Sequence, residues 1–418
     1  MRANDHVDVL YIDLDSYFAS VEQQDDPRLH RMPVAVVPSA DISSTATCIA
    51  ASYEAKALGI RTGTRVGEAR ERCPDIALRP ARHDRYVEVH GAVKSALERV
   101  LPVEKVWSID EFACLLKGSQ RRLPEAVALA RAARYGIHRE AGARLGVSIG
   151  LAANTLLAKI AAEMNKPDGL QWIAPGQERE RLAPLPLLAL PGINRRMEAR
   201  LRAAGVADVT ALFALPYRHA RMIWGGVQGE RFLRALHGET IPDPEARRRM
   251  IGHSQILVPA ARAPEEARAV ARRLLVKAAA RLRRLDRFAT RMTLSVRYPG
   301  DGRVRRETGF TAMQDTLSLL RILSRLWSDL PEAGRLRSVA IMLHGLVSRH
   351  EHTPDLFGSH PGQGNTASLA ALSILVDGLN RRYGRDVLTY GPRPAHLAPY
   401  TGAKIAFGRV PEGIEFNE

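Results

Sequence analysis

The basic residues of this chain are concentrated in one stretch. Residues 1–180 contain 24 Lys or Arg and 24 Asp or Glu, and residues 351–418 contain 6 and 7. Residues 181–240 contain 9 basic and 4 acidic side chains, and residues 241–350 contain 22 and 10. This asymmetry favours a neutral domain that carries a site, joined to a region that grips a polyanion such as nucleic acid or an anionic membrane surface. Arginine-rich helix faces that only contact water are the alternative.

Length and residue usage exclude several classes of protein. A chain of 418 residues is too long for one core, so we expect about three domains. No apolar run approaches the roughly 20 residues of a membrane span, and the N-terminus lacks an apolar signal region. Cys48, Cys73 and Cys114 form no Cys-x-x-Cys motif, so we expect no disulfides, no cysteine zinc site and a cytoplasmic location. The 13 histidines are scattered and support no Ser-His-Asp or Cys-His catalysis.

Hydrophobic periodicity predicts an α/β unit over residues 1–172, with residues 16–81 as an insertion. Strands are expected at 7–15, 32–38, 103–116 and 145–151, and helices at 16–24, 53–58, 66–73, 86–101, 124–141 and 154–163.

The remainder of the chain divides into four stretches. Residues 173–240 have the pattern of short helices, and the Pro-rich, charged residues 241–250 are typical of a linker. Residues 251–350 have the order strand, helix, strand, strand, helix, strand, which indicates a small sheet with helices on one face. Disorder is expected for 351–365, followed by a helix at 368–382.

Acidic residues lie at the ends of two strand-like segments. Asp13 and Asp15 are two positions apart, so both can face the same way, and Asp110 and Glu111 end the segment 103–116. Such oxygen ligands suit Mg²⁺, and a pair of ions can activate a hydroxyl and neutralise a leaving pyrophosphate. Surface carboxylates at strand ends are the alternative.

Three residues are candidates for binding phosphate groups. Lys166 lies in the turn Asn165–Gly169 that follows an apolar strand and a helix. Tyr53 and Lys56 are three positions apart on a short helix and share a face. An ordinary solvated helix surface or loop explains the same residues.

Two glycine turns and a basic strand pair are candidates for holding a nucleic-acid backbone. Gly192 and Ile193, and likewise Gly226 and Gly229, precede or begin helices whose N–H groups can bind phosphate. Simple capped turns are the alternative. The predicted strands around the turn 299–302 carry exposed cations, Arg297, Arg303 and Arg305.

Three segments together resemble the signatures of the Y-family, or translesion, DNA polymerases. The first is DLDSYFASVE at 13–22, the second is SIDE at 108–111, and the third runs from SIGLAANTLLAK at 148–159 to NKPDG at 165–169. They occur in the family's order and spacing, and the likeness covers residues 7–350. It implies a right-hand polymerase with a palm at 1–15 and 82–172, fingers at 16–81, a helix-hairpin-helix-like thumb at 173–240, a linker at 241–250, a βαββαβ little finger at 251–350 and a tail at 351–418.

The resemblance also implies a metal site. Asp13, Asp110 and Glu111 would hold two Mg²⁺ ions, assisted by the carbonyl group of Leu14. Asp15 matches a position that is not a principal ligand.

A nucleotide site follows from the same resemblance. Tyr17 and Phe18 would contact the nucleotide, and Phe18 matches the steric gate that would collide with a ribonucleotide 2′-hydroxyl. Tyr53, Lys56 and Lys166 would contact the triphosphate. Lys56 stands where the DinB (DNA polymerase IV) branch has Arg, so one point charge replaces a guanidinium fork.

The C-terminal tail resembles the UmuC branch, whereas Tyr53 is DinB-like. Asp355, Leu356 and Phe357 fall where relatives carry a sliding-clamp peptide, although its Gln anchor is missing here. A Leu-Phe pair can still fill a groove on a clamp, and the alternative is a loop end that folds back on its own chain. A UmuC-like tail also suggests contacts with a recombinase or an accessory subunit.

We therefore predict a monomeric, low-fidelity, template-directed DNA polymerase that acts past damaged bases on primer–template DNA and dNTP. We expect it in the cytoplasm with the nucleoid and away from membranes. No second acidic cluster suggests an exonuclease domain, so no proofreading is expected. The main alternative is a non-catalytic adapter of the ImuB type, but such relatives lack the acidic residues that are present here. A third hypothesis is a nuclease that binds nucleic acid and uses the same metal ions.

Overall fold

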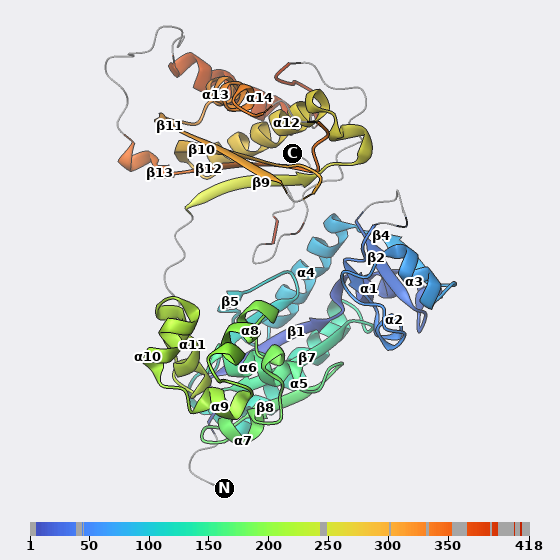
Figure 1. Cartoon of the computed structure of the whole chain (residues 1–418). Coiled ribbons are helices and arrows are strands. Elements are labelled where there is room, and N and C mark those ends of the chain that lie inside the picture. Colours follow the sequence, from blue (N-terminus) through green and yellow to red (C-terminus); the bar gives the residue numbers. More distant parts are fainter. Residues whose placement is uncertain are drawn as a thin grey trace. The chain divides into compact units, whose positions relative to one another are not determined.

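The computed structural model describes residues 6–38, 44, 46–242, 249–300, 302–331, 334–352, 366–384, 387–391, 405 and 410–411. The chain divides into two compact units, shown in Figure 1. The first comprises Met1–Asp243 with Ala403–Gly413, and the second comprises Pro244–Gly402 with Ile414–Glu418. Within the described ranges, no helix is both long and apolar enough to cross a bilayer. Most of the predicted linker and the candidate clamp segment, Asp355, Leu356 and Phe357, lie outside the described residues.

A five-stranded sheet forms the centre of the first unit. Its strand order is β5-β6-β1-β7-β8, with β1 antiparallel to both neighbours and β7 parallel to β8. The strands are β1 (Val9–Asp15), β5 (Lys105–Val106), β6 (Glu111–Leu115), β7 (Gly146–Ala152) and β8 (Leu170–Ile173).

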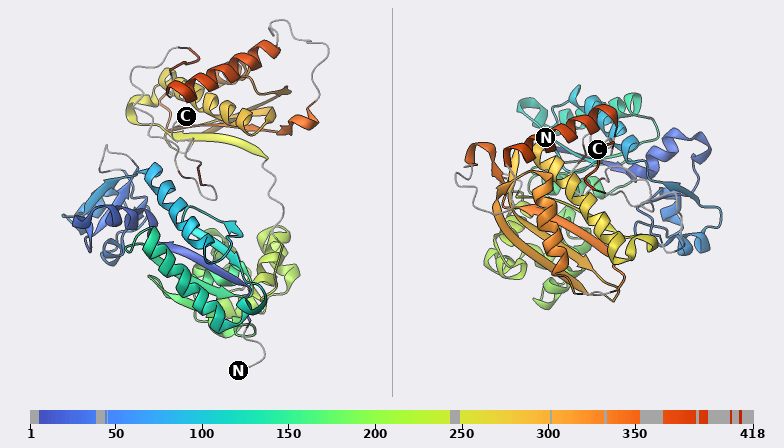
Figure 2. Two further views of the ribbon diagram at one scale, coloured as in Figure 1. Left: turned by 180° about the vertical axis from the view of Figure 1, so that it is seen from behind. Right: turned by 90° about the horizontal axis from the view of Figure 1, so that it is seen from above.

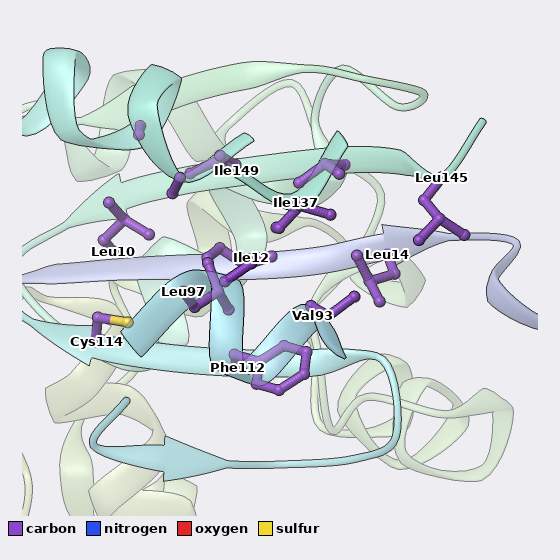
Figure 3. Close-up of a cluster of buried hydrophobic side chains, with 14 of the residues drawn as sticks. Leu10, Ile12, Leu14, Val93, Leu97, Phe112, Cys114, Ile137, Leu145 and Ile149 are labelled. Carbon is purple, nitrogen blue, oxygen red and sulfur yellow. The ribbon is translucent and has the colours of Figure 1, made fainter. Parts of the chain in front are cut away.

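Both faces of β1 are buried, because helices cover the sheet on two sides. Leu10, Ile12 and Leu14 point into the core formed with α4 (His83–Glu98) and α5 (Leu123–Glu140), as Figure 3 shows. Val9 and Tyr11 alternate with them and pack in a second core that includes α6 (Thr155–Glu163). The continuation of this alternation places Asp13 and Asp15 on the α6 side of the sheet.

Gly150 allows α6 to lie directly against the sheet. A Cβ atom at this position would come within 1.9 Å of the Ala158 carbonyl oxygen and 2.5 Å of the Ala162 nitrogen, both in α6. Because Gly150 pairs with Tyr11 in the sheet, this contact brings α6 to the strand that carries the acidic residues.

The predicted insertion, residues 16–81, contains a small sheet with strand order β3-β2-β4 and helices beside it. Its elements are α1 (Tyr17–Asp25), β2 (Val34–Val37), β3 (Ala50–Ala51), α2 (Tyr53–Ala57), α3 (Val66–Arg72) and β4 (Ala77–Pro80). The sequence pattern predicted β2 and the helices but not β3 or β4.

The stretch from 173 to 240 is helical, as its pattern predicted. Its elements are α7 (Glu178–Leu182), α8 (Arg195–Ala203), α9 (Val209–Phe213), α10 (Tyr217–Trp224) and α11 (Val227–Leu236). Apolar side chains from these helices share the core on the α6 side of the sheet.

The second unit is a four-stranded antiparallel sheet of order β11-β10-β12-β9, and β13 pairs with one end of β10. Figures 1 and 2 show α12, α13 and α14 on one face of this sheet. The predicted βαββαβ order is confirmed by β9 (Met250–Ile256), α12 (Pro264–Arg284), β10 (Arg287–Arg297), β11 (Arg303–Met313), α13 (Thr316–Ser328) and β12 (Ser338–His344), which are followed by β13 (Val347–Ser348) and α14 (Thr366–Tyr383).

The prediction of one strand over 103–116 is wrong. The segment is a hairpin in which β5 pairs with β6 and residues 107–110 form the turn. The Trp107 N–H group donates to the Glu111 carbonyl oxygen at 2.9 Å and closes the turn. Asp110 therefore lies in the turn, and Glu111 begins β6 instead of ending a strand.

Candidate active site

Acidic side chains from β1 and β6 lie in one row across the sheet of the first unit. Asp13 is directly opposite Glu111 on β6 and opposite Ser148 on β7. The turn before β6 is tied to β1, because the Leu14 N–H group donates to the Asp110 carbonyl oxygen at 2.9 Å. Strand register thus gathers Asp13, Asp110 and Glu111 from segments about a hundred residues apart in the sequence.

Lys166 is the ionic partner of Asp13. Its Nζ atom lies 2.6 Å from Asp13 Oδ1 and 2.7 Å from Glu163 Oε1. Burial raises the pKa of Asp13 well above its usual value, and the Lys166 ammonium opposes this effect. Burial alone would lower the pKa of Lys166, but the Asp13 and Glu163 carboxylates outweigh it and the pKa is raised.

The other two carboxylates are also held by neighbours. The Ser108 hydroxyl donates to Asp110 Oδ1, and burial raises the pKa of Asp110. Lys159 forms an ion pair with Glu111, and the buried Tyr11 hydroxyl also bonds to Glu111. Each carboxylate of the row thus has at least one fixed donor or cation.

Asp15 forms a structural anchor instead of an open ligand. It is 1% exposed and accepts from the Ser148 hydroxyl at 2.8 Å and from the Asp168 N–H group at 2.8 Å. The Tyr53 hydroxyl lies 3.3 Å from its other oxygen. Burial raises the pKa of Asp15, and the two shorter hydrogen bonds oppose this. Asp15 therefore ties β7, the 165–169 turn and α2 to the end of β1.

The donor set fits hard divalent cations in its chemistry. Asp13, Asp110, Glu111 and the Leu14 carbonyl provide oxygen atoms from adjacent segments, which is what Mg²⁺ prefers. In the part of the chain that the structure describes, no group of three His, Cys, Asp or Glu side chains is placed to hold a metal ion. The lysine ammonium groups and the Ser108 hydroxyl take up the carboxylate oxygens instead.

Cationic and aromatic groups from the insertion lie next to this row. The Lys56 Nζ atom lies 4.3 Å from the centre of the Tyr53 ring and donates to the Ser16 hydroxyl at 2.7 Å. Burial, together with the nearby Lys166 ammonium, lowers the pKa of Lys56. Lys56, Tyr53 and Lys166 thus lie together beside Asp15.

Tyr17 and Phe18 begin α1 and have different environments. The Tyr17 side chain is 3% exposed, and its hydroxyl donates to the Tyr86 carbonyl oxygen at 2.6 Å. Its side chain is therefore buried and bonded within the protein. The Phe18 ring stacks on the Tyr86 ring at 4.4 Å with an angle of 10°, and the Tyr86 hydroxyl donates to Glu22 at 2.8 Å. The Tyr86 ring thus holds the Phe18 ring in place, a contact that the sequence did not reveal.

The glycine turns of the helical region differ from our expectation that their N–H groups are free to bind phosphate. The N–H groups of Ile193, Gly226 and Gly229 donate to carbonyl groups within the same region, so they are not free donors, and DNA binding at these residues stays a prediction. Gly229 also lies inside α11, where a Cβ atom would come within 2.1 Å of the Ala220 carbonyl oxygen. Gly192 is exposed with a φ of 91°, and α11 begins at an exposed end without a side-chain cap.

Arg297, Arg303 and Arg305 are exposed on one face of the second-unit sheet. Arg297 pairs with Arg303 across β10 and β11, and Arg305 is opposite Ser295. Met292, Leu294 and Val296 alternate with these positions and face the core beneath the helices. The three arginines therefore lie on the face that α12 and α13 do not cover, which we call the helix-free face.

Family models match most of both units. The model of the impB/mucB/samB family matches residues 12–163, and the model of its C-terminal domain matches residues 248–356. The chain belongs to the impB/mucB/samB family, the Y-family of DNA polymerases. It is therefore a DNA-directed DNA polymerase of the translesion type, and such polymerases need divalent metal ions.

Individual Y-family relatives are similar over nearly the whole chain. DNA polymerase IV of Moorella thermoacetica is 32% identical over 411 residues, which cover 96% of this chain and 98% of the relative. DNA polymerase IV of Halorhodospira halophila is 31% identical, covering 84% and 98%.

Solved structures share the right-hand fold. A Y-family DNA polymerase chimera of Dbh and Dpo4 superposes with a TM-score of 0.70 at 20% identity, covering 82% of this chain and 99% of the chimera. An insertion ternary complex of Dbh DNA polymerase gives a TM-score of 0.56 over the same shares.

Proposed function

We propose that Asp13, Asp110 and Glu111, with the Leu14 carbonyl, hold two Mg²⁺ ions for nucleotidyl transfer from dNTP to a primer 3′-hydroxyl. Bound there, the ions would promote deprotonation of the hydroxyl and neutralise the leaving pyrophosphate. The observation that carries the proposal is the row of one buried and two partly buried carboxylates at adjacent strand ends, each balanced by a lysine or a hydroxyl. Burial without a metal ion is electrostatically unfavourable for such groups, which favours cation binding.

The nucleotide is held by residues from three segments. Lys166 and Lys56 provide point charges for the triphosphate, and the Tyr53 hydroxyl provides a donor beside them. The Phe18 ring, stacked on Tyr86, excludes a ribose 2′-hydroxyl. Asp15 positions these groups without binding the substrate itself.

DNA is held through its phosphate backbone without reading the base sequence. Gly192, the exposed start of α11 and the arginines Arg297, Arg303 and Arg305 provide these contacts. A polymerase that holds only the DNA backbone does not read the template bases through these contacts, which suits synthesis past damaged bases.

Several finer assignments remain predictions. We propose that the monomeric enzyme acts in the cytoplasm on nucleoid DNA. We also propose that Asp355, Leu356 and Phe357 bind a sliding clamp and that the tail contacts a recombinase or an accessory subunit. Support for these partners comes from the tail sequence alone.

The decisive experiment is primer extension on undamaged and abasic templates with Mg²⁺ and dNTPs. Asp110→Asn should reduce the rate by about a thousandfold or more while its affinity for DNA stays within about twofold of the wild type. Glu88→Gln removes the same charge from an exposed position on α4 and should behave as the wild type. Parallel loss of extension and DNA binding in Asp110→Asn would indicate misfolding, and intact DNA binding without extension by the wild type would favour the adapter.

A further inference from the structure

One acidic side chain interrupts the basic helix-free face of the second unit. Glu307 lies on β11 directly opposite Thr293 of β10, two positions from Arg305 on the same face. It is the one acidic residue in the four strands β9, β10, β11 and β12. The face that would hold DNA phosphates therefore carries a fixed anion of its own.

Two arginines converge on this carboxylate. Arg305 Nη2 lies 2.6 Å from Glu307 Oε2, and Arg291 Nη1 lies 3.5 Å from Glu307 Oε1. The Thr293 hydroxyl donates to Oε2 at 3.0 Å, and His344 Nε2 lies 3.9 Å away. The Arg305 hydrogen bond, followed by that of Thr293, lowers the pKa of Glu307, so the carboxylate is ionised at neutral pH.

Among the residues that the structure describes, the neighbouring arginines have no such acidic partner on this face. Arg303 donates to the neutral Ser295 hydroxyl at 2.9 Å. Arg297 lies directly opposite Arg303 in the register of β10 and β11. A phosphate group can approach Arg297 and Arg303 without displacing any anion of the described residues. To reach Arg305 or Arg291, it must compete with Glu307 for the guanidinium groups.

We propose that Glu307 is a built-in competitor for DNA phosphate that weakens the grip of the helix-free face. This inference rests on the proposed role of that face in binding the DNA backbone. An exposed carboxylate at 32% side-chain exposure reduces the affinity moderately and does not abolish it. The enzyme therefore releases DNA more readily than it would without the Glu307 charge. It also adds fewer nucleotides per binding event than it would without that charge.

The test is equilibrium binding of the full chain to a fluorescent primer–template duplex over a series of salt concentrations. Glu307→Gln keeps an oxygen acceptor for Thr293 and removes the charge. It should bind about two- to fivefold more tightly. The dependence of log K on log salt should steepen by about 0.9, the value of one additional phosphate contact. Glu265→Gln, in the exposed first turn of α12 and so off this face, is the control for net charge and should leave both quantities unchanged.

A double-mutant cycle with Arg305→Gln shows whether Glu307 acts through its arginine partner. The combined variant should lose most of the gain in affinity that Glu307→Gln has alone. An unchanged or weaker affinity of Glu307→Gln would overturn the proposal, because a carboxylate that aims Arg305 at DNA gives the opposite sign.

A second double variant, Arg297→Gln with Arg303→Gln, tests the face itself. If it weakens DNA binding while Glu307→Gln has no effect, only the competitor role is wrong. If it leaves DNA binding unchanged, the proposed DNA face is wrong and the competitor role is wrong with it.

Discussion

The carboxylate row of the first unit and the helix-free face of the second use charge in opposite ways. Asp13 is 5% exposed, and its carboxylate meets the Lys166 ammonium at 2.6 Å. Arg305 is 55% exposed in its side chain and pairs with Glu307 at the same distance. The two ion pairs have equal lengths, but water screens only the second.

In the carboxylate row the positions of the charges matter most, whereas on the helix-free face their number matters most. In the row, strand register and the turn before β6 place the carboxylates, so a single substitution leaves a charged group without its partner. On the helix-free face, arginine side chains move in water, and each contributes a small, salt-dependent amount. One region therefore suits chemistry at a fixed point, and the other suits a grip that slides along a uniform backbone.

The largest effect is expected at Asp15. Asp15→Ala leaves the buried Ser148 hydroxyl and the partly buried Asp168 N–H group without their acceptor, and the free energy of unfolding of the first unit should fall by about 3 kcal/mol. Urea denaturation followed by tryptophan fluorescence measures this, because Trp107, Trp172 and Trp224 lie in the first unit. Arg303→Gln should change the stability by less than about 0.5 kcal/mol. Equal stability of the two variants would contradict the conclusion that single contacts stabilise the first-unit site more than the helix-free face.

The next effect concerns sugar selection. Phe18→Ala removes the ring that stacks on Tyr86, and discrimination between dNTP and rNTP, measured as the ratio of kcat/KM values, should fall about 10- to 200-fold. Tyr17→Phe is the matched control, because it loses only the hydrogen bond to the Tyr86 carbonyl and should retain discrimination. Unchanged discrimination in Phe18→Ala would remove the gate assignment.

The smallest effect per residue is expected on the helix-free face. Arg297→Gln combined with Arg303→Gln should weaken DNA binding several-fold at low salt and make the salt dependence shallower by about 1.8. The kcat at saturating DNA should stay near the wild-type value, since neither residue belongs to the row of the first unit. A large loss of kcat would mean that the two regions do not divide their tasks as described.

Local patterns predicted much of the fold for a physical reason. The helices over 124–141 and 154–163 and the βαββαβ order of the second unit follow from side-chain periodicity, which is a property of neighbouring residues. The hairpin within 103–116 escaped prediction because its turn is closed by Ser108 and by the Trp107–Glu111 backbone bond, and not by Gly or Pro. The bonded state of the glycine-turn N–H groups escaped prediction because free N–H groups cannot be told from bonded ones in a sequence.

The acidic residues near the strand ends, the order of the family signatures and the basic character of residues 181–350 can all be found in the sequence. The partners of each side chain are visible only in the folded structure. Ser148 reaches Asp15 across 133 residues, Tyr86 backs Phe18 from another helix, and Glu307 meets arginines from its own strand and the next. Strand register and helix packing set these contacts, and both depend on residues too distant in the chain for a local pattern to encode.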